Sequence, residues 1–423
     1  MKYHIPYHKR EINFYLPDQC LVDQYLPVHV EAHFDPIAEV NHSLNFPVDQ
    51  IRLEEYTGIR TAAIAINDIT RPVPHHQLLP PVLNRLTEMG VKPENIKIII
   101  ATGTHTPHHL KDIKKILPED IIEGYTIISH DSDDQPNLVY LGKTTRETPV
   151  YANRFFMESD LRIVCGNIEP HHFAGFSGGS KTAAIGLAGR LTITKNHEWL
   201  LHPNSIPGEF DHNPVRMDIE EIGKMMDIHY GINALLNNER QIVQVISGSP
   251  LAMIKAGIPI IRKLSQTPVQ HLYDIVIASP GGYPKDINFY QAQKAITHAT
   301  LINRQGGVVI LVAACKDGIG SESYKKFMVG LNSHQEVLDK FQAQGFQIGP
   351  HKAVQIAMRA RNHRFILISE MGKNDVNSLL LEYAHSIEDA VEMAMSVTNT
   401  LPTIAILPKA TNTMPVVSLK KDI

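Results

Sequence analysis

The chain has 423 residues, of which 43% are hydrophobic and 20% charged, and its formal net charge is −4. This size and composition are typical of a globular protein with two or three domains, and without a basic excess a nucleic-acid partner is disfavoured. Only three cysteines occur, far apart and without a CxxC pair, which disfavours a disulfide framework and a cysteine-rich zinc site: Cys20, Cys165 and Cys315.

No segment has the apolar length of a signal peptide or a membrane span. The N-terminal residues MKYHIPYHKREINFYLPD lack a continuous apolar core, and stretches such as Gly307–Cys315 are too short to cross a bilayer. We therefore expect a protein of the reducing cytoplasm, without a membrane partner.

Short β-branched runs alternate with helical patterns through the first part of the chain. Strands are predicted at Ala62–Ile66, Ile96–Ala101, Thr126–Ser129 and Leu161–Cys165, with helices between several of them, including His75–Met89 and Tyr151–Glu158. This alternation is typical of βαβ units and a largely parallel sheet.

The same alternation starts again near residue 272, after a proline-containing segment, Leu264–His271, that is interpreted as a linker. Strands are predicted at Tyr273–Ala278, Val308–Ala313, Phe365–Ile368 and Ile404–Leu407, and helices at Phe289–Thr297, His334–Ala343 and Ile387–Ser396. The sequence thus predicts two α/β domains with largely parallel sheets and an interdomain cleft: an N-terminal domain, 1–270, and a C-terminal domain, 272–407. A tail of about 408–423 is expected to pack back on the N-terminal domain.

Unusual polar strings follow several predicted strands. They are Asn67–Arg71, Thr102–His105, Gly166–His171 and Pro280–Pro284. Ligands of open α/β sheets bind beyond the carboxyl ends of the strands, so these strings are expected to meet at one binding site. Turns are generally polar, and each string alone could be an ordinary turn.

The segment Glu169–Lys181, EPHHFAGFSGGSK, holds the densest group of chemically useful residues. Its glycines, Gly175, Gly178 and Gly179, permit a backbone that turns N–H groups toward an anion, with Lys181 presenting a cation. A Walker A loop is an alternative, although Ser180 stands where its second glycine belongs. Lys181 could also be an ordinary solvated loop residue.

Two histidines end polar strings and suggest acid–base chemistry. His105 and His171 facing each other across a cleft would suit a reversible reaction, because imidazole exchanges protons near neutral pH. Either could instead be structural. Arg71 has the shape to grip a carboxylate with two hydrogen bonds, although with Asp68 it could be a plain surface pair.

Further along the chain, Gln291 and Lys294 are three residues apart and would share one face of a helix after the Gly281-Gly282 turn. That face could hold hydroxyl and carboxylate oxygens of a ligand.

Together these strings resemble the nickel-dependent lactate racemase family. The resemblance lies in five ordered motifs that span most of the chain: DITRPVP (Asp68–Pro74), ATGTHTP (Ala101–Pro107), EPHHFAGFSGGSK (Glu169–Lys181), TKNH (Thr194–His197) and GGYPKDINFYQAQK (Gly281–Lys294).

The resemblance implies a nickel-pincer nucleotide, built by separate maturation enzymes and attached through a thioamide to Lys181, with His197 as the protein ligand of nickel. It implies His105 and His171 as the two acid/base residues. Other residues at matching positions are expected to contact the cofactor, namely Thr102, Gly103, Ser177, Gly178, Gly179 and Tyr290, or the substrate, namely Asp68, Arg71, Gln291 and Lys294.

The implied reaction inverts carbon 2 of a small 2-hydroxy acid by reversible hydride transfer to the cofactor, while a histidine takes the hydroxyl proton. Ile69 and Ile185 depart from the family pattern, where histidine and proline are usual, and leave the substrate open among lactate, other short or aromatic 2-hydroxy acids, malate and sugar acids. The competing hypotheses are a phosphate- or nucleotide-binding hydrolase or kinase that uses residues 175–182, and a non-catalytic sugar-acid sensor.

Overall fold

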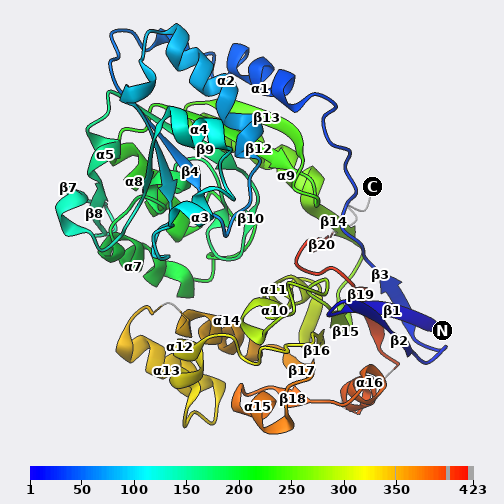
Figure 1. The fold of residues 1–423 in the computed structure, drawn as a ribbon. Coiled ribbons are helices and arrows are strands. Elements are labelled where there is room, and N and C mark those ends of the chain that lie inside the picture. Colours follow the sequence, from blue (N-terminus) through cyan, green and yellow to red (C-terminus); the bar gives the residue numbers. More distant parts are fainter. Residues whose placement is uncertain (348, 397–400, 418–423) are drawn as a thin grey trace. The chain divides into compact units, whose positions relative to one another are not determined.

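The computed structural model describes residues 1–347, 349–396 and 401–417 and divides into two compact units. The central unit is His29–Leu264, and the terminal unit combines Met1–Val28 with Ser265–Ile423. Both are α/β and each is built on a six-stranded, mostly parallel sheet, which confirms the predicted fold class (Figure 1).

The central unit contains a sheet of strand order β13-β12-β9-β4-β5-β6, in which only β12 and β13 are antiparallel. The strands of the whole unit, which include the separate pairs β7-β8 and β10-β11, are β4 (Ala62–Asn67), β5 (Ile96–Ala101), β6 (Thr126–Ser129), β7 (Leu138–Lys143), β8 (Pro149–Asn153), β9 (Leu161–Asn167), β10 (Pro170–His171), β11 (Gly175–Phe176), β12 (Tyr230–Leu236) and β13 (Ile242–Gly248). Its helices are α1 (Pro36–Asn45), α2 (His75–Glu88), α3 (Leu110–Ile113), α4 (Glu119–Gly124), α5 (Arg154–Met157), α6 (Lys181–Ala184), α7 (Arg190–Glu198), α8 (Pro214–Met225) and α9 (Pro250–Ser265), with short 3-10 turns η1 (Leu53–Glu55), η2 (Pro93–Asn95), η3 (Gln135–Asn137) and η4 (Trp199–Leu201).

The terminal unit contains an all-parallel sheet of strand order β18-β17-β16-β15-β19-β3. The strands of the whole unit, which include the separate pairs β1-β2 and β14-β20, are β1 (Lys2–Tyr7), β2 (Arg10–Tyr15), β3 (Leu21–Gln24), β14 (Gln266–Val269), β15 (Tyr273–Ala278), β16 (Asn303–Val312), β17 (Arg364–Ile368), β18 (Glu382–Tyr383), β19 (Thr403–Leu407) and β20 (Met414–Val417). Its helices are α10 (Phe289–Ala292), α11 (Lys294–Ala299), α12 (Glu322–Met328), α13 (His334–Gln344), α14 (Pro350–Ala360), α15 (Lys373–Ser378) and α16 (Ile387–Met395).

The division of the chain differs from the predicted domains at both ends. The first 28 residues belong to the terminal unit, because β3 extends its sheet beside β19. β20, part of the predicted tail, pairs with β14, which lies within the predicted domain 1–270 but belongs to the terminal unit. The part of that prediction on 418–423 lies outside the described residues. These short strands have partners more than 140 residues away along the chain, so no local pattern predicts them.

Two predicted helices also differ from the structure. Tyr151–Glu158 begins as β8, which pairs with β7, and only Arg154–Met157 is helical. Cross-strand pairing outweighs the local helical pattern there, and the amide of Tyr151 donates to Thr192 Oγ1 at 2.8 Å. The segment Phe289–Thr297 forms two short helices, α10 and α11, that meet at Gln293.

Side chains alternate between the two faces of the central sheet and explain its layers. On one face the larger residues of β4, β5 and β9 pack with apolar residues of α1, α2 and α4 in one buried cluster. On the other face β4 presents Ala63, Ala65 and, at its end, Asn67, and α6 packs against β4 and β9 there. Small residues on both sides allow this close approach. Gly186 continues the pattern, because a side chain at that position would overlap Ala101.

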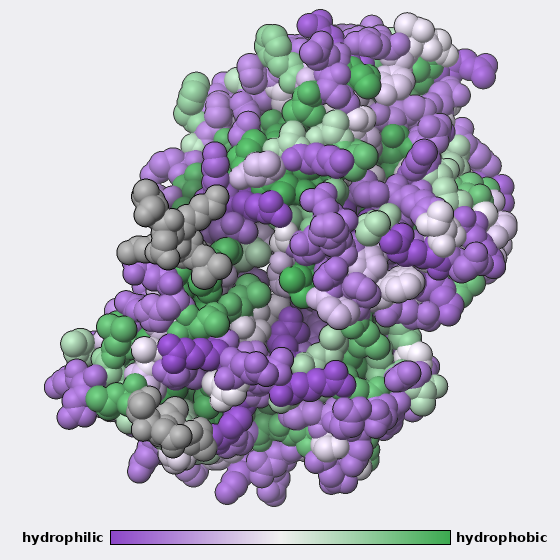
Figure 2. Space-filling view, turned by 180° about the vertical axis from the view of Figure 1, so that it is seen from behind, coloured by the Kyte–Doolittle hydropathy of each residue, from purple (hydrophilic) through white to green (hydrophobic). Residues whose placement is uncertain are grey.

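The visible surface in Figure 2 is mostly hydrophilic, with hydrophobic residues scattered among the polar ones. Among the described residues, no helix is both long enough and apolar enough to cross a membrane.

Candidate active site

The carboxyl ends of β4, β5 and β9 lie level in the central sheet. β4 is in register with β5 through Asn67 and Ala101, and with β9 through Ile66 and Cys165. The polar strings that follow these strands therefore start at one edge of the sheet, as predicted for the central unit.

The turn after β4 holds His105 through a buried carboxylate. Nδ1 of His105 lies 2.7 Å from Oδ2 of Asp68, whose side chain is 3% exposed, and Thr70 Oγ1 donates to the other carboxylate oxygen at 2.8 Å. Burial raises the pKa of Asp68, but hydrogen bonds from His105 and Thr70 and the charges of His105 and Arg71 outweigh it and leave this pKa below its usual value. An ionised Asp68 accepts a proton-bearing Nδ1, which leaves Nε2 of His105 as the acceptor.

The turn after β5 brings His105 to this carboxylate. The amide of His105 donates to Thr102 O at 3.0 Å, and Gly103 has φ +57°. Thr102 Oγ1 donates to His130 O at 2.6 Å, while the amide of Gly103 donates to Gly186 O at 2.9 Å. The His105 side chain remains 55% exposed, so its ring is held at one nitrogen and accessible at the other.

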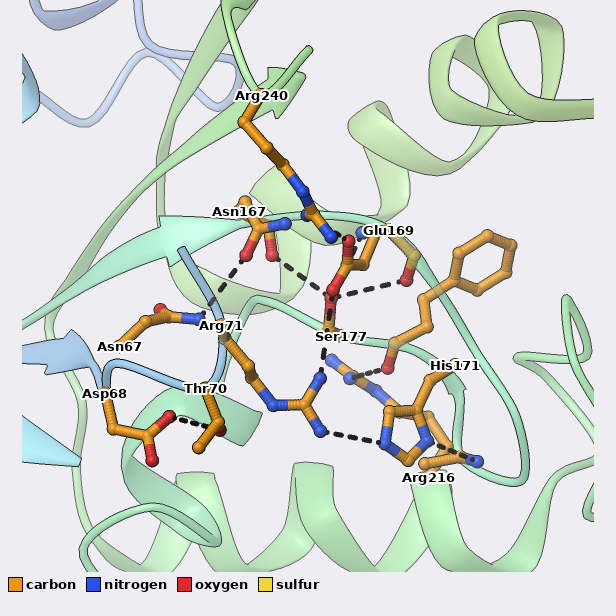
Figure 3. Close-up of polar contacts among 12 residues, drawn as sticks. Asn67, Asp68, Thr70, Arg71, Asn167, Glu169, His171, Ser177, Arg216 and Arg240 are labelled. Carbon is orange, nitrogen blue, oxygen red and sulfur yellow. Dashed lines mark hydrogen bonds and ion pairs between the residues drawn. The ribbon is translucent and has the colours of Figure 1, made fainter. Parts of the chain in front are cut away.

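His171 lies on a small hairpin beyond β9. Strand β10 pairs with β11, with His171 opposite Gly175, and the amide of Ala174 donates to His171 Nδ1 at 3.1 Å. Gly175 has φ +70°, and a side chain there would overlap the carbonyl oxygen of Glu209. The hairpin thus fixes the His171 ring with its Nε2 directed at Arg71, 3.3 Å from the guanidinium Nη2 (Figure 3).

Arg71 reaches from the β4 turn between His171 and Glu169 (Figure 3). Its Nη1 lies 3.8 Å from Glu169 Oε1, and the other oxygen of Glu169 accepts from Arg240 Nη1 at 2.8 Å. Glu169 therefore lies between two guanidinium groups. Arg71 remains partly exposed, and it can present its guanidinium to an incoming carboxylate.

The glycine-rich loop is held from inside the protein. Arg216, fully buried, donates to Phe176 O at 3.0 Å and to Gly178 O at 3.1 Å. The amide of Gly179 donates to Asn233 Oδ1 at 2.8 Å, and the amide of Ser177 donates to Glu169 O at 2.8 Å. Because protein acceptors use these two N–H groups, the loop is a poor match to a phosphate cradle, which disfavours the Walker A alternative.

Lys181 follows this loop at the start of α6 and is only 9% exposed. Among the described residues, its amine makes no hydrogen bond or ion pair. Burial, reinforced by the charges of Arg71 and Arg216, holds the pKa of Lys181 well below its usual value. A lowered pKa favours the neutral amine, whose lone pair is the form that attacks an electrophile.

His197 lies on the last turn of α7. Its Nδ1 is 3.0 Å from Asn196 Oδ1, and the ring of Phe173 contacts it edge-on, with 4.9 Å between ring centroids. Burial, with the charges of Lys181 and Arg71, lowers the pKa of His197 to about 3. The imidazole is therefore neutral at any working pH, and the electrostatic influence of Lys181 and Arg71 shows that it shares their surroundings.

The remaining predicted residues lie in the terminal unit. Lys294 Nζ donates to Gln291 Oε1 at 2.7 Å, so these two side chains do meet, on neighbouring short helices. Tyr290 stands beside them and contacts Tyr324. The structure thus brings together the site residues predicted in the central unit, and separately the three in the terminal unit.

Sequence reasoning missed the roles of several residues that hold this site together. They are Asn196 beside His197, Arg216, its ion-pair partner Glu220, which accepts from Ser180 Oγ at 3.0 Å, and Arg240. Arg240 lies in a hairpin turn without a motif, and Arg216 lies inside a helix, so only their spatial contacts identify them. Glu169 was part of a motif, but its position between two arginines has no sequence signal.

Comparisons with known proteins place this geometry in a family. Residues 7–208 match the lactate racemase N-terminal domain and residues 269–414 the lactate racemase C-terminal domain. The chain is 31% identical over 415 residues to the lactate racemase of Lactiplantibacillus plantarum (96% of this chain, 97% of that one), and 30% identical over 414 residues to that of Thermoanaerobacterium thermosaccharolyticum (96% of each).

Solved structures agree with these matches. The lactate racemase apoprotein of Thermoanaerobacterium thermosaccharolyticum superposes with a TM-score of 0.89 at 28% identity, covering 98% of this chain and all of that one. A Thermotoga maritima protein shares the fold at 16% identity, with a TM-score of 0.65 and coverage of 92% of this chain and all of the other. The family matches span most of the sequence, and the chain belongs to the lactate racemase family of isomerases.

Proposed function

We propose that this protein interconverts the two configurations at carbon 2 of a small 2-hydroxy acid, lactate or a close relative, with His105 and His171 as acid/base residues and with a nickel-pincer nucleotide. One observation carries the proposal. The single turn Asp68–Arg71 contacts both histidines, the carboxylate of Asp68 at His105 and the guanidinium of Arg71 at His171. Two histidines held by one turn beside a carboxylate-binding arginine suit a reaction that runs in both directions.

In this proposal one histidine accepts the substrate hydroxyl proton as the C2 hydrogen leaves, and the other gives a proton to that oxygen when hydrogen comes back to the opposite face. His171 Nδ1 accepts from the amide of Ala174, so the neutral His171 ring carries its proton on Nε2 and is the donor when His105 is the base. In the neutral ring of His105, Asp68 selects the tautomer in which Nε2 is unprotonated, because its carboxylate accepts from Nδ1. The other histidine serves the opposite enantiomer. Each histidine acts as a base in one direction and as an acid in the other.

Arg71 is proposed to hold the substrate carboxylate through two parallel hydrogen bonds. Glu169 lies 3.8 Å from it, a loose ion pair that positions the guanidinium without occupying all its donors. Gln291 and Lys294 are proposed, from their motif alone, to bind the remaining substrate oxygens.

The central unit also has residues that fit the cofactor. A buried, partnerless amine with a low pKa fits covalent attachment at Lys181, and a neutral imidazole fits a metal ligand at His197. The described residues contain no group of three or more His, Cys, Asp or Glu side chains arranged to hold a metal. If the nucleotide supplies most of the nickel ligands, His197 is the one ligand that the chain has to provide.

When bound, this cofactor would supply an acceptor that takes the C2 hydrogen with its electron pair and gives it back. Thr102, Gly103, Ser177, Gly178, Gly179 and Tyr290 are proposed to contact it. We further propose that maturation enzymes supply it in the cytoplasm, where the free cysteines Cys20, Cys165 and Cys315 remain reduced.

The test uses protein made together with the cofactor-building enzymes. We expect a mass increase on Lys181, about one nickel per chain, and racemisation in a chiral assay that runs from lactate to sugar acids. His105→Ala and His171→Ala should each nearly abolish turnover while nickel and the mass increase remain, whereas the exposed His76→Ala should leave turnover unchanged.

Two results would contradict the proposal. Unmodified Lys181 and no nickel in protein that was co-produced in this way would remove the cofactor. Equal nickel loss in His105→Ala, His171→Ala and His197→Ala would remove the separate roles given to these histidines.

A further inference from the structure

Asn196, the residue before the proposed nickel ligand, is fully buried on α7 and contacts the ring of His197 at Nδ1. Its Nδ2 donates to Val215 O at 3.0 Å and to Asp218 Oδ2 at 2.9 Å. Both amide hydrogens are thereby used on α8. Its Oδ1 is the atom that faces His197 Nδ1, at 3.0 Å.

The orientation of this amide is determined by its surroundings. If it were flipped, its oxygen would face a carbonyl and a carboxylate, neither of which can donate a hydrogen bond. Oδ1 of Asn196 is therefore an acceptor, and the contact with His197 is a hydrogen bond only when Nδ1 carries the proton. The lone pair of the ring is then on Nε2.

Asp218 anchors Asn196 in turn. It is fully buried on α8 and accepts from Thr144 Oγ1 at 2.6 Å and from Thr148 Oγ1 at 2.9 Å, besides the amide of Asn196. Three donors from two different segments thus hold this carboxylate. The chain of hydrogen bonds runs from the two threonines in the turn between β7 and β8 through Asp218 on α8 to the last turn of α7.

We propose that Asn196 and Asp218 are positioning residues that hold His197 in the tautomer with an unprotonated Nε2, ready to bind nickel; this inference rests on the proposed function of His197 as the metal ligand. Outer hydrogen bonds of this kind fix the ring orientation of metal-binding histidines, and their loss typically costs roughly 10- to 100-fold in metal affinity. A purely structural role of Asn196 and Asp218 is the alternative, so the test needs a measurement that does not depend on the stability of the protein.

The first measurement is the tautomer of His197 in apoprotein labelled with 15N-histidine, read from the nitrogen shifts by NMR and assigned with His197→Ala. We expect the proton on Nδ1. His130 provides an internal reference, since its Nδ1 faces the amide of Asn153 at 3.0 Å and its Nε2 faces Ala188 O at 3.0 Å, which favours the opposite tautomer. A wild-type His197 with its proton on Nε2 would overturn the inference without any variant.

The second measurement is nickel retention by the loaded protein during dialysis against a chelator. Asn196→Leu should mix the two tautomers of His197 and release nickel roughly 10- to 100-fold faster. The exchange variant Asn196→Asp/Asp218→Asn keeps an acceptor at His197 Nδ1 and a hydrogen bond between α7 and α8, but it removes the donor to Val215 O, so it should restore part of the retention. Asn153→Leu is the matched control, since it removes a buried asparagine that contacts a different histidine.

The outcomes are separable. If Asn196→Leu and Asn153→Leu lose stability alike and retain nickel alike, the positioning role is refuted while the nickel ligand stands. If His197→Ala itself retains nickel as well as the wild type does, the ligand assignment in the proposed function fails instead.

Discussion

Replacing Asp68 with asparagine tests the relation between the β4 turn and His105. The carboxylate is buried, accepts from Thr70 and His105, and has a lowered pKa, so it is ionised near neutral pH. Asparagine keeps the size but removes the charge. Its amide nitrogen can also donate to Nδ1, which would move the ring proton to Nε2 and leave His105 unable to accept a proton there.

The expected loss follows from the interaction that is removed. A hydrogen bond to a charged group contributes about 1.5–3 kcal/mol. Converted at 1.36 kcal/mol for each factor of ten, this corresponds to a roughly 10- to 150-fold fall in kcat/KM. Conversion of part of the histidine to the wrong tautomer would add to the loss.

The assay follows both enantiomers of lactate by chiral chromatography, with rates normalised to the nickel content of each preparation. Because the equilibrium constant between enantiomers is one, kcat/KM must fall by the same factor in both directions. Thr70→Val is the matched control. It removes the other hydrogen bond to the same carboxylate but leaves the charge of Asp68 and its contact with His105, so it should lower kcat/KM less than Asp68→Asn does. Nickel-loaded Asp68→Asn with wild-type turnover would show that Asp68 does not orient a catalytic base.

The same carboxylate should make stability depend on pH. The pKa of Asp68 is lower in the folded protein than its usual 3.8, so the ionised carboxylate stabilises the folded protein above that pH, and this stabilisation is lost as pH falls through the folded pKa. The difference in the free energy of unfolding between wild type and Asp68→Asn, measured by urea denaturation, should therefore narrow below about pH 3.8 and remain constant above pH 5. Arg71→Lys cannot form two parallel hydrogen bonds and should raise KM by roughly 10-fold or more in the chiral assay, while nickel content is unchanged. Gly175→Ala should lower the free energy of unfolding by at least about 1–3 kcal/mol, from backbone strain at φ +70° and overlap with Glu209, and normal stability would contradict the hairpin geometry. Arg216→Met leaves Glu220 and two loop carbonyls without their buried donor and should cost about 3–5 kcal/mol in urea denaturation; a loss below about 1 kcal/mol would refute that role.

The fold class, and the edge of the sheet that carries the candidate site, could be predicted from the amino-acid pattern. The buried β-branched runs at 62–66, 96–101 and 161–165 predict strands because their residues suit positions covered on both faces, and the structure has strands there. Polar strings after such strands must start at the edge where parallel strands end, so Asp68, His105 and His171 were predicted to lie close together. The contacts of the β4 turn confirm this for the central unit.

The pairing of individual side chains could not be predicted in this way and follows from the packing of the folded chain. Asp68 and His105 are 37 residues apart and Arg71 and His171 are 100 apart, and sheet order and register determine those pairings rather than any local pattern. The same holds for Asn196 with Asp218, for β3 in the terminal sheet, and for β8, where a partner strand outweighs a helical pattern. Local sequence determines the periodicity of an element, but its neighbours depend on long-range packing that a single stretch of residues does not encode.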